Sequence, residues 1–177
     1  MPCQKVRFSV WFRGRKLPFF VFRRIFGFMR MKYKYKSLKD TIDKIGQQIA
    51  YSVDYANDFL PSHTSPKEIW SILKDNTIYK HDPPGVELLQ SFPSLMDDNY
   101  WGTPGMGDCD CFTIAAVSCA VARGIPVRCV LVGNHSDMPS HIYCQMFDGN
   151  AWIDFDLVNS DYGYTKPYKY KQILNVH

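Results

Sequence analysis

Long apolar runs are missing from this sequence of 177 residues. A helix needs about 20 apolar residues to cross a bilayer, and the longest such run near the start, residues 17–22, lies between Arg15-Lys16 and Arg23-Arg24. No small-residue cleavage site follows this run. We therefore expect neither a membrane span nor a secretory signal peptide.

Acidic residues are absent from the first part of the chain. Residues 1–36 contain eleven Lys or Arg and no Asp or Glu, whereas the remaining 141 residues contain ten bases and seventeen acids. The same 36 residues hold ten of the 27 aromatic side chains. This division predicts a basic, aromatic N-terminal arm over residues 1–36 and a single mildly acidic domain over residues 37–177.

The arm exposes too much aromatic surface to remain alone in water. Apolar and polar residues alternate over residues 6–12, which predicts a strand, and residues 19–22 are expected to return beside it after a turn. We expect the arm to dock on protein, which is its own domain, a second copy of the chain or a larger assembly. Nucleic acid is the alternative, because interleaved cations and rings suit phosphates and bases, but no named nucleic-acid motif is present.

A disulfide framework is not expected, although the chain has six cysteines. Cys119 lies in an apolar helical stretch, and Cys129 and Cys144 lie in apolar strand-like runs, where a free cysteine behaves as a small hydrophobe. This usage predicts a reducing location, inside a cell or within a viral particle. The sequence shows no acidic cluster typical of calcium binding, and we expect no cofactor.

Two amphipathic helices are predicted in the first half of the domain. The first begins after Ser37, keeps apolar residues at steps of three or four, and ends before Pro61. The second begins at Ser65-Pro66-Lys67-Glu68, a capping box with proline in the first helical position. A loop rich in glycine and proline then occupies residues 93–107 and leads to Cys109.

The chain is organised around a central helix that begins at Cys109. Gly107 and Asp108 precede a run of small apolar residues, and Gly124 follows Arg123 where the helix should end. The positive end of the helix dipole favours a thiolate at Cys109 and makes it a candidate nucleophile. The neighbouring acids act against thiolate formation.

Three strands are predicted after this helix, over residues 127–132, 141–147 and 151–158. Asp148-Gly149 is a strong signal for a two-residue hairpin turn. With that turn His141 lies directly opposite Asp156, at a distance of about 5 Å between Cβ atoms. Asp154 falls opposite Tyr143 and is the less favoured partner for the imidazole.

These features predict a catalytic triad. Cys109 would be the nucleophile, His141 its base, and Asp156 the carboxylate that orients the imidazole. Trp101 and Asp108 are weaker candidates for contacts with substrate or oxyanion, beside the backbone N–H of Cys109.

A metal site is the alternative for the same stretch. Cys109, Asp110 and Cys111 could join His135 and His141 as ligands. However, side chains two residues apart on a helix diverge by about 200°, and no second Cys-x-x-Cys completes a site. We therefore predict no metal.

Three ordered motifs resemble the transglutaminase-like cysteine proteinase superfamily. They are Gly107-Asp108-Cys109-Asp110 with its helix and the following Arg123-Gly124-Ile125-Pro126-Val127-Arg128, then His141, then Trp152-Ile153-Asp154-Phe155-Asp156. Asp82-Pro83 and Val86-Glu87-Leu88-Leu89 are similar to the lead-in of bacterial and phage-encoded members. The resemblance covers roughly residues 80–158.

The resemblance implies an α+β fold with a papain/transglutaminase-like core, in which the nucleophile starts a central helix packed on an antiparallel sheet. It also implies that Cys109, His141 and Asp156 act on a glutamine side chain or a peptide bond through a thioester. Relatives usually carry a second Asp where this chain has Cys111.

Two function classes follow. One is an enzyme, a thiol-dependent peptidase, amidase or glutamine acyltransferase acting on a protein or peptide substrate. The other is a catalytically idle structural or assembly protein, such as a virion component, that keeps the fold and docks through its basic aromatic arm.

Overall fold

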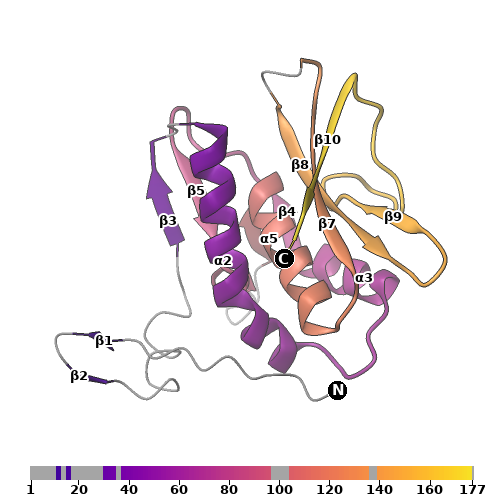
Figure 1. The fold of residues 1–177 in the computed structure, drawn as a ribbon, viewed down its shortest axis with the longest axis horizontal. Helices are drawn as coiled ribbons and strands as arrows, with labels where there is room; N and C mark the ends of the chain where they lie inside the picture. The colour runs from indigo at the N-terminus through magenta and orange to yellow at the C-terminus, as the bar shows by residue number, and fades with distance from the viewer. Residues whose placement is uncertain are drawn as a thin grey trace.

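The computed structural model describes residues 11–12, 15–16, 30–34, 37–96, 104–135 and 139–176. Helices and strands are mixed along the chain, which confirms the predicted α+β class (Figure 1). The elements in chain order are β1 (Trp11–Phe12), β2 (Arg15–Lys16), β3 (Arg30–Tyr33), α2 (Leu38–Phe59), α3 (Pro66–Asn76), β4 (Thr77–Tyr79), β5 (Glu87–Gln90), α4 (Phe92–Met96), β6 (Gly105–Gly107), α5 (Cys109–Ala122), β7 (Val127–Gly133), β8 (His141–Phe147), β9 (Trp152–Phe155) and β10 (Tyr170–Asn175).

The largest sheet is antiparallel and has the strand order β10-β7-β8-β9. The three strands predicted after the central helix are confirmed as β7, β8 and β9. The sequence analysis did not predict β10. This strand lies at the edge of the sheet and most of its side chains are exposed, so its sequence lacks the apolar alternation of a half-buried strand.

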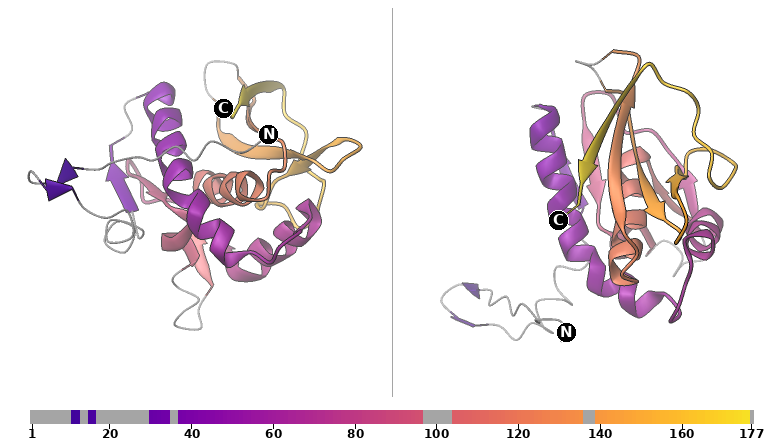
Figure 2. Two further views of the ribbon diagram at one scale, coloured as in Figure 1. Left: turned by 60° about the horizontal axis from the view of Figure 1, so that its bottom comes forward. Right: turned by 45° about the vertical axis from the view of Figure 1, so that its right-hand side comes forward.

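Helix α5 lies in the middle of the molecule, with the four-stranded sheet against one side and α2 against another (Figures 1 and 2). It is buried on all sides from Asp110 to Ala120. A helix surrounded in this way needs apolar or small residues around its whole circumference. The resulting core is continuous between α5, the inner face of the sheet and α2.

The predicted helix ends are confirmed. The Ser37 hydroxyl accepts a hydrogen bond from a first-turn amide of α2 at 3.2 Å. Ser65 and Glu68 form the complete capping box at the start of α3. Helix α5 ends at Arg123, and Gly124 takes the left-handed conformation with φ +66°, where a glycine has no steric penalty.

The predicted register of the β8–β9 hairpin is wrong by two residues. The structure pairs Cys144 with Phe155 and Met146 with Ile153, whereas a turn at Asp148-Gly149 would have placed Ile153 opposite Cys144. Because the slip is an even number, every side chain keeps the predicted face of the sheet. His141 and Asp156 are therefore diagonal neighbours on one face instead of directly opposed residues.

The side chain of Asp148 explains the shift of the turn. Its Oδ1 accepts hydrogen bonds from the backbone N–H groups of Asn150 and Ala151, both at 2.9 Å. The backbone N–H of Asp148 also donates to the carbonyl of Ala151 at 3.1 Å. An aspartate that bonds the backbone two and three residues ahead moves the turn to Gly149 and Asn150.

Part of the predicted arm belongs to a sheet. Strand β3 lies before residue 36 and pairs antiparallel with β5, and Met31 and Tyr33 pack against the core. Strands β1 and β2 pair antiparallel with each other. The predicted return strand at residues 19–22 lies outside the described residues.

A short parallel pair, β4 with β6, delivers the chain to the start of α5. Strand β6 runs close against α4, because a Cβ atom added at Gly105 would lie 1.9 Å from the carbonyl oxygen of Leu95. A Cβ added at Gly107 would lie 2.7 Å from the Cβ of Cys111. Only glycine permits this approach of the backbone to the helix that follows it.

Within the described ranges no helix combines the length and the apolar character needed to cross a bilayer. The cysteines found in these ranges, at positions 109, 111, 119, 129 and 144, are free thiols. Cys109 is partly exposed and the other four are buried.

Candidate active site

Cys109 is the first residue of α5, as predicted. Asp108 occupies the N-cap position, but its side chain makes no capping hydrogen bond. The Thr113 hydroxyl lies 2.7 Å from the carbonyl oxygen of Cys109 and 3.1 Å from that of Ile142. This hydroxyl fastens the first turn of α5 to β8, the strand that begins at His141.

His141 and Asp156 are in direct contact. The Nε2 atom of the imidazole lies 2.9 Å from Oδ2 of the carboxylate, and both side chains are largely buried. The carboxylate also accepts hydrogen bonds from Asn159 Nδ2 at 2.6 Å, Thr165 Oγ1 at 2.9 Å and the backbone N–H of Val158 at 3.2 Å. These donors hold Asp156 in one orientation.

Two tyrosine rings stack against the imidazole of His141. The rings of Tyr143 and Tyr168 each lie 5.9 Å from the His141 ring between centroids, at interplanar angles of 23° and 21°. Tyr143 is two residues along the same strand, whereas Tyr168 reaches the site from the segment before β10. Near-parallel rings at this separation restrict rotation of the imidazole.

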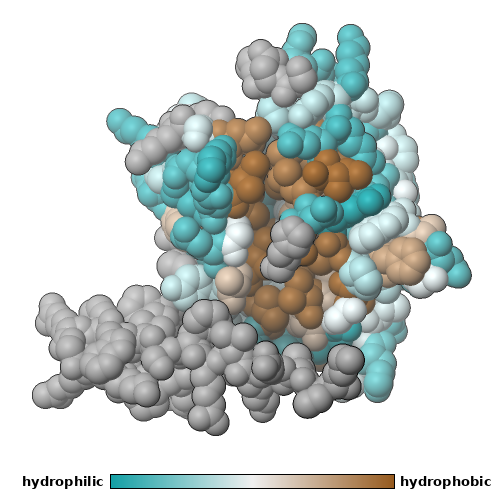
Figure 3. All heavy atoms as spheres, in the orientation of Figure 1, coloured by the Kyte–Doolittle hydropathy of each residue, from teal (hydrophilic) through white to brown (hydrophobic). Residues whose placement is uncertain are grey.

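A cavity of about 470 Å³ connects the candidate nucleophile and base. Cys109 and His141 both line it, together with residues from the first half of α2. Figure 3 shows apolar side chains gathered in the hollow between α2 and the strands of the large sheet. A second cavity, of about 130 Å³, lies on the other side of His141 and is bordered by Asp156 and Tyr168.

The resting thiol of Cys109 is not activated by its surroundings. Burial raises its pKa above the ordinary value, and the charges of Asp108 and Asp110 add to this effect, while a hydrogen bond from the backbone of Ile142 acts in the opposite direction. Loss of hydration and two adjacent carboxylates thus oppose the thiolate that the start of α5 was expected to favour.

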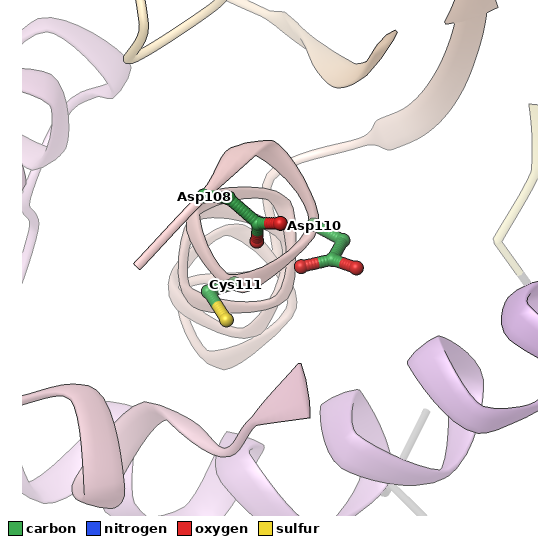
Figure 4. Close-up of side chains that lie close together, drawn as sticks. All are labelled: Asp108, Asp110 and Cys111. Carbon is green, nitrogen blue, oxygen red and sulfur yellow. The ribbon is translucent and has the colours of Figure 1, made fainter. Parts of the chain in front are cut away.

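The start of α5 also carries an acidic cluster that the sequence analysis did not predict. Oxygen atoms of Asp108 and Asp110 and the sulfur of Cys111 lie within 4.8 Å of one another (Figure 4). Burial, and then the neighbouring Asp108, raise the pKa of Asp110 well above its usual range, and the charges of Glu87 and Asp82 contribute. Asp82 and Glu87 come from one segment and Asp108 and Asp110 from another, so no single acidic run marks the four acids in the sequence.

Cys111 is a structural thiol in this arrangement. Its side chain is fully buried and donates a hydrogen bond to the carbonyl oxygen of Leu88 at 3.0 Å. Burial raises the pKa of the Cys111 thiol well above its ordinary value. It therefore remains protonated and ties α5 to β5.

Of the three residues predicted to form a triad, Cys109 and His141 line one cavity, and Asp156 contacts His141. Asp154, the second candidate, lies opposite Gln145 and accepts a hydrogen bond from its Nε2 at 2.6 Å, away from the imidazole. Trp101 lies outside the described residues. His135 does not join a cluster of possible metal ligands within the part of the chain that the structure describes.

Other residues of the site carried no signal in the sequence. Tyr168, Thr165 and Asn159 lie in an irregular segment between β9 and β10, where hydrogen bonds to Asp156 and ring contacts depend on the path of the chain. Glu87 belongs to a short apolar strand and lines the main cavity. Asn159 follows Asp156 by only three residues, and this spacing could have suggested a hydrogen bond between the two side chains.

No protein-family model matches the chain, and no curated protein sequence matches it either. Among solved structures, the chain is similar to a candidate cysteine protease from Cytophaga hutchinsonii, with a TM-score of 0.39 and 18% sequence identity. The likeness covers 65% of this chain and 37% of that chain. Because the TM-score and the sequence identity are both low, this likeness supports no functional conclusion for the chain.

Proposed function

We propose that this protein carries out thiol-dependent amide or acyl chemistry on a protein or peptide, with Cys109 as nucleophile, His141 as base and Asp156 as the orienting carboxylate. One observation supports this above all others. His141, which contacts Asp156 at 2.9 Å, lines the same cavity as Cys109. A polarised imidazole beside a thiol at a helix start is the arrangement that nucleophilic catalysis requires.

The raised thiol pKa determines how the first step proceeds. Because Cys109 is neutral at rest, His141 removes the proton as the sulfur attacks the carbonyl carbon of the substrate. The Nε2 atom faces Asp156, which leaves Nδ1 as the nitrogen that accepts this proton. The imidazole then gives the proton to the nitrogen of the breaking C–N bond, and the amine leaves while the acyl group stays on sulfur as a thioester.

The second step releases the acyl group. Water attacks the thioester carbon, His141 accepts a proton from that water, and the C–S bond breaks to give a carboxylic acid and the original thiol. If an amine attacks in place of water, the product is a new amide. Hydrolysis, deamidation and acyl transfer therefore use the same residues. They differ only in the substrate amide that the thiol attacks and in whether water or an amine attacks the thioester.

The arrangement of elements also supports a papain/transglutaminase-like core, as the sequence resemblance implies. The candidate nucleophile starts a buried helix, the base starts β8, and the orienting carboxylate directly follows β9, the antiparallel neighbour of β8. The position where relatives usually carry a second Asp holds Cys111, whose thiol links α5 to β5.

The proposal is tested by trapping the thioester. The protein is incubated with a library of peptides and glutamine-containing peptides, quenched in acid and analysed by intact-mass spectrometry. We expect an acyl adduct that maps to Cys109, is absent in Cys109→Ser, and forms about 100-fold more slowly or less in His141→Ala. Cys119→Ala and His63→Ala are matched controls, because Cys119 is buried elsewhere in α5 and His63 is exposed.

Retention of the full rate in His141→Ala would overturn the proposal. A combination of two other results would also overturn it. These are that no adduct or product forms, and that iodoacetamide alkylates Cys109 at the same rate with and without His141. This combination would support the other candidate function.

The other candidate is an idle structural or assembly protein, for example in a virion. The feature that favours it is the strong imbalance of charge over residues 1–36, with eleven basic residues and no acidic one. In this case the arm would dock on protein or, as the alternative, on nucleic acid. The thioester-trapping experiment separates this function from catalysis, since docking needs neither Cys109 nor His141.

A further inference from the structure

The cavity beside Cys109 has two chemically different regions. One region is apolar and is lined by Leu38 and Ile42 of α2 and by Leu131 of the large sheet. The other is acidic and is formed by Glu87, Asp108 and Asp110, and no lysine or arginine of the described part of the chain lines the cavity. A space with an aliphatic region and an acidic region matches a long side chain that has an apolar stem and a cationic head.

Two of these carboxylates have unused hydrogen-bonding capacity. Asp110 is only 5% exposed, and among the described residues neither its Oδ1 atom nor Oδ1 of Asp108 has a hydrogen-bond partner. The side chains of Asp110 and Asp108 also share a hydrogen bond, so an added donor would be needed only for the two remaining Oδ1 atoms. A buried polar atom without a partner is costly, and such a donor would remove that cost. Burial and the charge of Asp108 also raise the pKa of Glu87, which shows how poorly the acids of this region are compensated.

We propose that this cavity binds a lysine or arginine side chain of the substrate, next to the acyl group that Cys109 attacks. This inference rests on the proposed function for its link to catalysis. The stem of the side chain would lie against Leu38, Ile42 and Leu131, and its cationic head would donate hydrogen bonds to Asp108, Asp110 and Glu87. Charge-assisted hydrogen bonds of this kind are stronger than neutral ones.

A divalent metal ion fits the same place less well. Of the three possible ligands grouped by the structure, Cys111 already donates its thiol proton to the Leu88 carbonyl. Two carboxylates then remain, both from one short segment, whereas hard divalent ions prefer about six oxygen ligands. An ammonium or guanidinium group needs only acceptors and supplies the donors that Asp108 and Asp110 lack.

The test measures binding separately from catalysis. Short peptides that differ at one position, with arginine, lysine, citrulline or norleucine, are titrated by calorimetry into Cys109→Ala protein. We expect the two cationic peptides to bind about 10- to 100-fold more tightly than the citrulline and norleucine peptides. In Glu87→Gln this preference should shrink, whereas Asp161→Asn, an exposed acid outside the cavity, should retain it.

Several results would overturn the inference. One is equal binding of the norleucine and lysine peptides. Another is tight binding of Mn²⁺ or Zn²⁺ alone with no discrimination among the peptides, which would make the cluster a metal site. A third is full retention of the preference in Glu87→Gln together with Asp108→Asn, with both proteins shown to be folded by thermal melting. If the cationic preference holds but no thioester forms on Cys109 in the native protein, the binding site stands and the proposed chemistry fails.

Discussion

The ring of Tyr168 lies nearly parallel to the imidazole of His141, with 5.9 Å between the centroids and 21° between the planes. These residues come from separate parts of the chain, His141 from the start of β8 and Tyr168 from the segment just before β10. The contact leaves the Nε2 atom of His141 aligned with Asp156. Tyr168 is therefore a positioning residue for the proposed base.

Removal of the Tyr168 ring should lower turnover without weakening substrate binding. We expect Tyr168→Ala to reduce kcat about 10- to 100-fold with little change in KM, because a base held in a range of orientations transfers protons less efficiently. Tyr168→Phe keeps the ring and should retain most of the activity. Steady-state kinetics and pH–rate profiles of the three proteins check this, and equal activity of Tyr168→Ala and the parent would show that the ring contact does not position His141.

The carboxylate that contacts His141 should matter far more than its neighbour on β9. We expect Asp156→Asn to lower turnover by about 10² to 10⁴-fold, since an amide neither stabilises the imidazolium nor selects the same tautomer. Asp154→Asn is the matched control, because Asp154 bonds Gln145 and not the imidazole. Thermal melting of both variants separates loss of function from loss of folding, and similar activity of the two would contradict the assignment.

The buried acid Asp110 should make folding less favourable as the pH rises. Its pKa is raised in the folded state, so the unfolded chain releases this proton at a lower pH than the folded chain does. The stabilising contribution of the protonated form is fully present below the unfolded pKa of about 4 and is lost as pH rises toward the folded pKa. Asp110→Asn should therefore increase the free energy of unfolding at pH 7 and have little effect near pH 3.

Asp148→Asn is a control variant, for which we expect the opposite dependence of stability on pH. Backbone hydrogen bonds from Ala151 and Asn150 lower the pKa of Asp148, so its contribution is present above the unfolded pKa and is lost as pH falls. This variant should be less stable than the parent at pH 7, and the difference should decrease in acid. Urea unfolding curves between pH 3 and pH 8 measure both trends, and a parallel pH dependence of the two variants would refute them.

The close approach of β6 to α4 should make Gly105 intolerant of any side chain. An added Cβ would lie 1.9 Å from the Leu95 carbonyl oxygen, so Gly105→Ala must displace backbone. We expect it to lower stability by about 1–3 kcal/mol. Gly46→Ala lies in α2 with no atom within 4 Å of the added Cβ and should instead gain up to about 1 kcal/mol from helix propensity. Denaturant midpoints of the two proteins test this, and stabilisation in both would show that β6 can move away.

Local sequence rules predicted most of the elements that hold the site. Capping at Ser37 and Ser65, the helix from Cys109 to Arg123 and the strands around His141 depend on neighbours a few residues apart, so short-range patterns were sufficient. The face shared by His141 and Asp156 was also predictable. Side chains alternate between the two faces of a strand, so an error of two residues in register leaves each side chain on the predicted face. The register itself was not predictable from the turn dipeptide, because the Asp148 side chain moved the turn.

The sequence by itself determined which residues start helices, which faces of the strands are apolar, and that a thiol, an imidazole and a carboxylate follow one another in the order of a triad. Only the tertiary structure decided how these groups behave. Burial and the charges of Asp108 and Asp110 raise the pKa of the Cys109 thiol, Glu87 and Asp82 contribute to the raised pKa of Asp110, and the segment before β10 brings Tyr168 onto His141. Electrostatic and hydration effects depend on distances between residues far apart in the chain, and folding alone sets those distances.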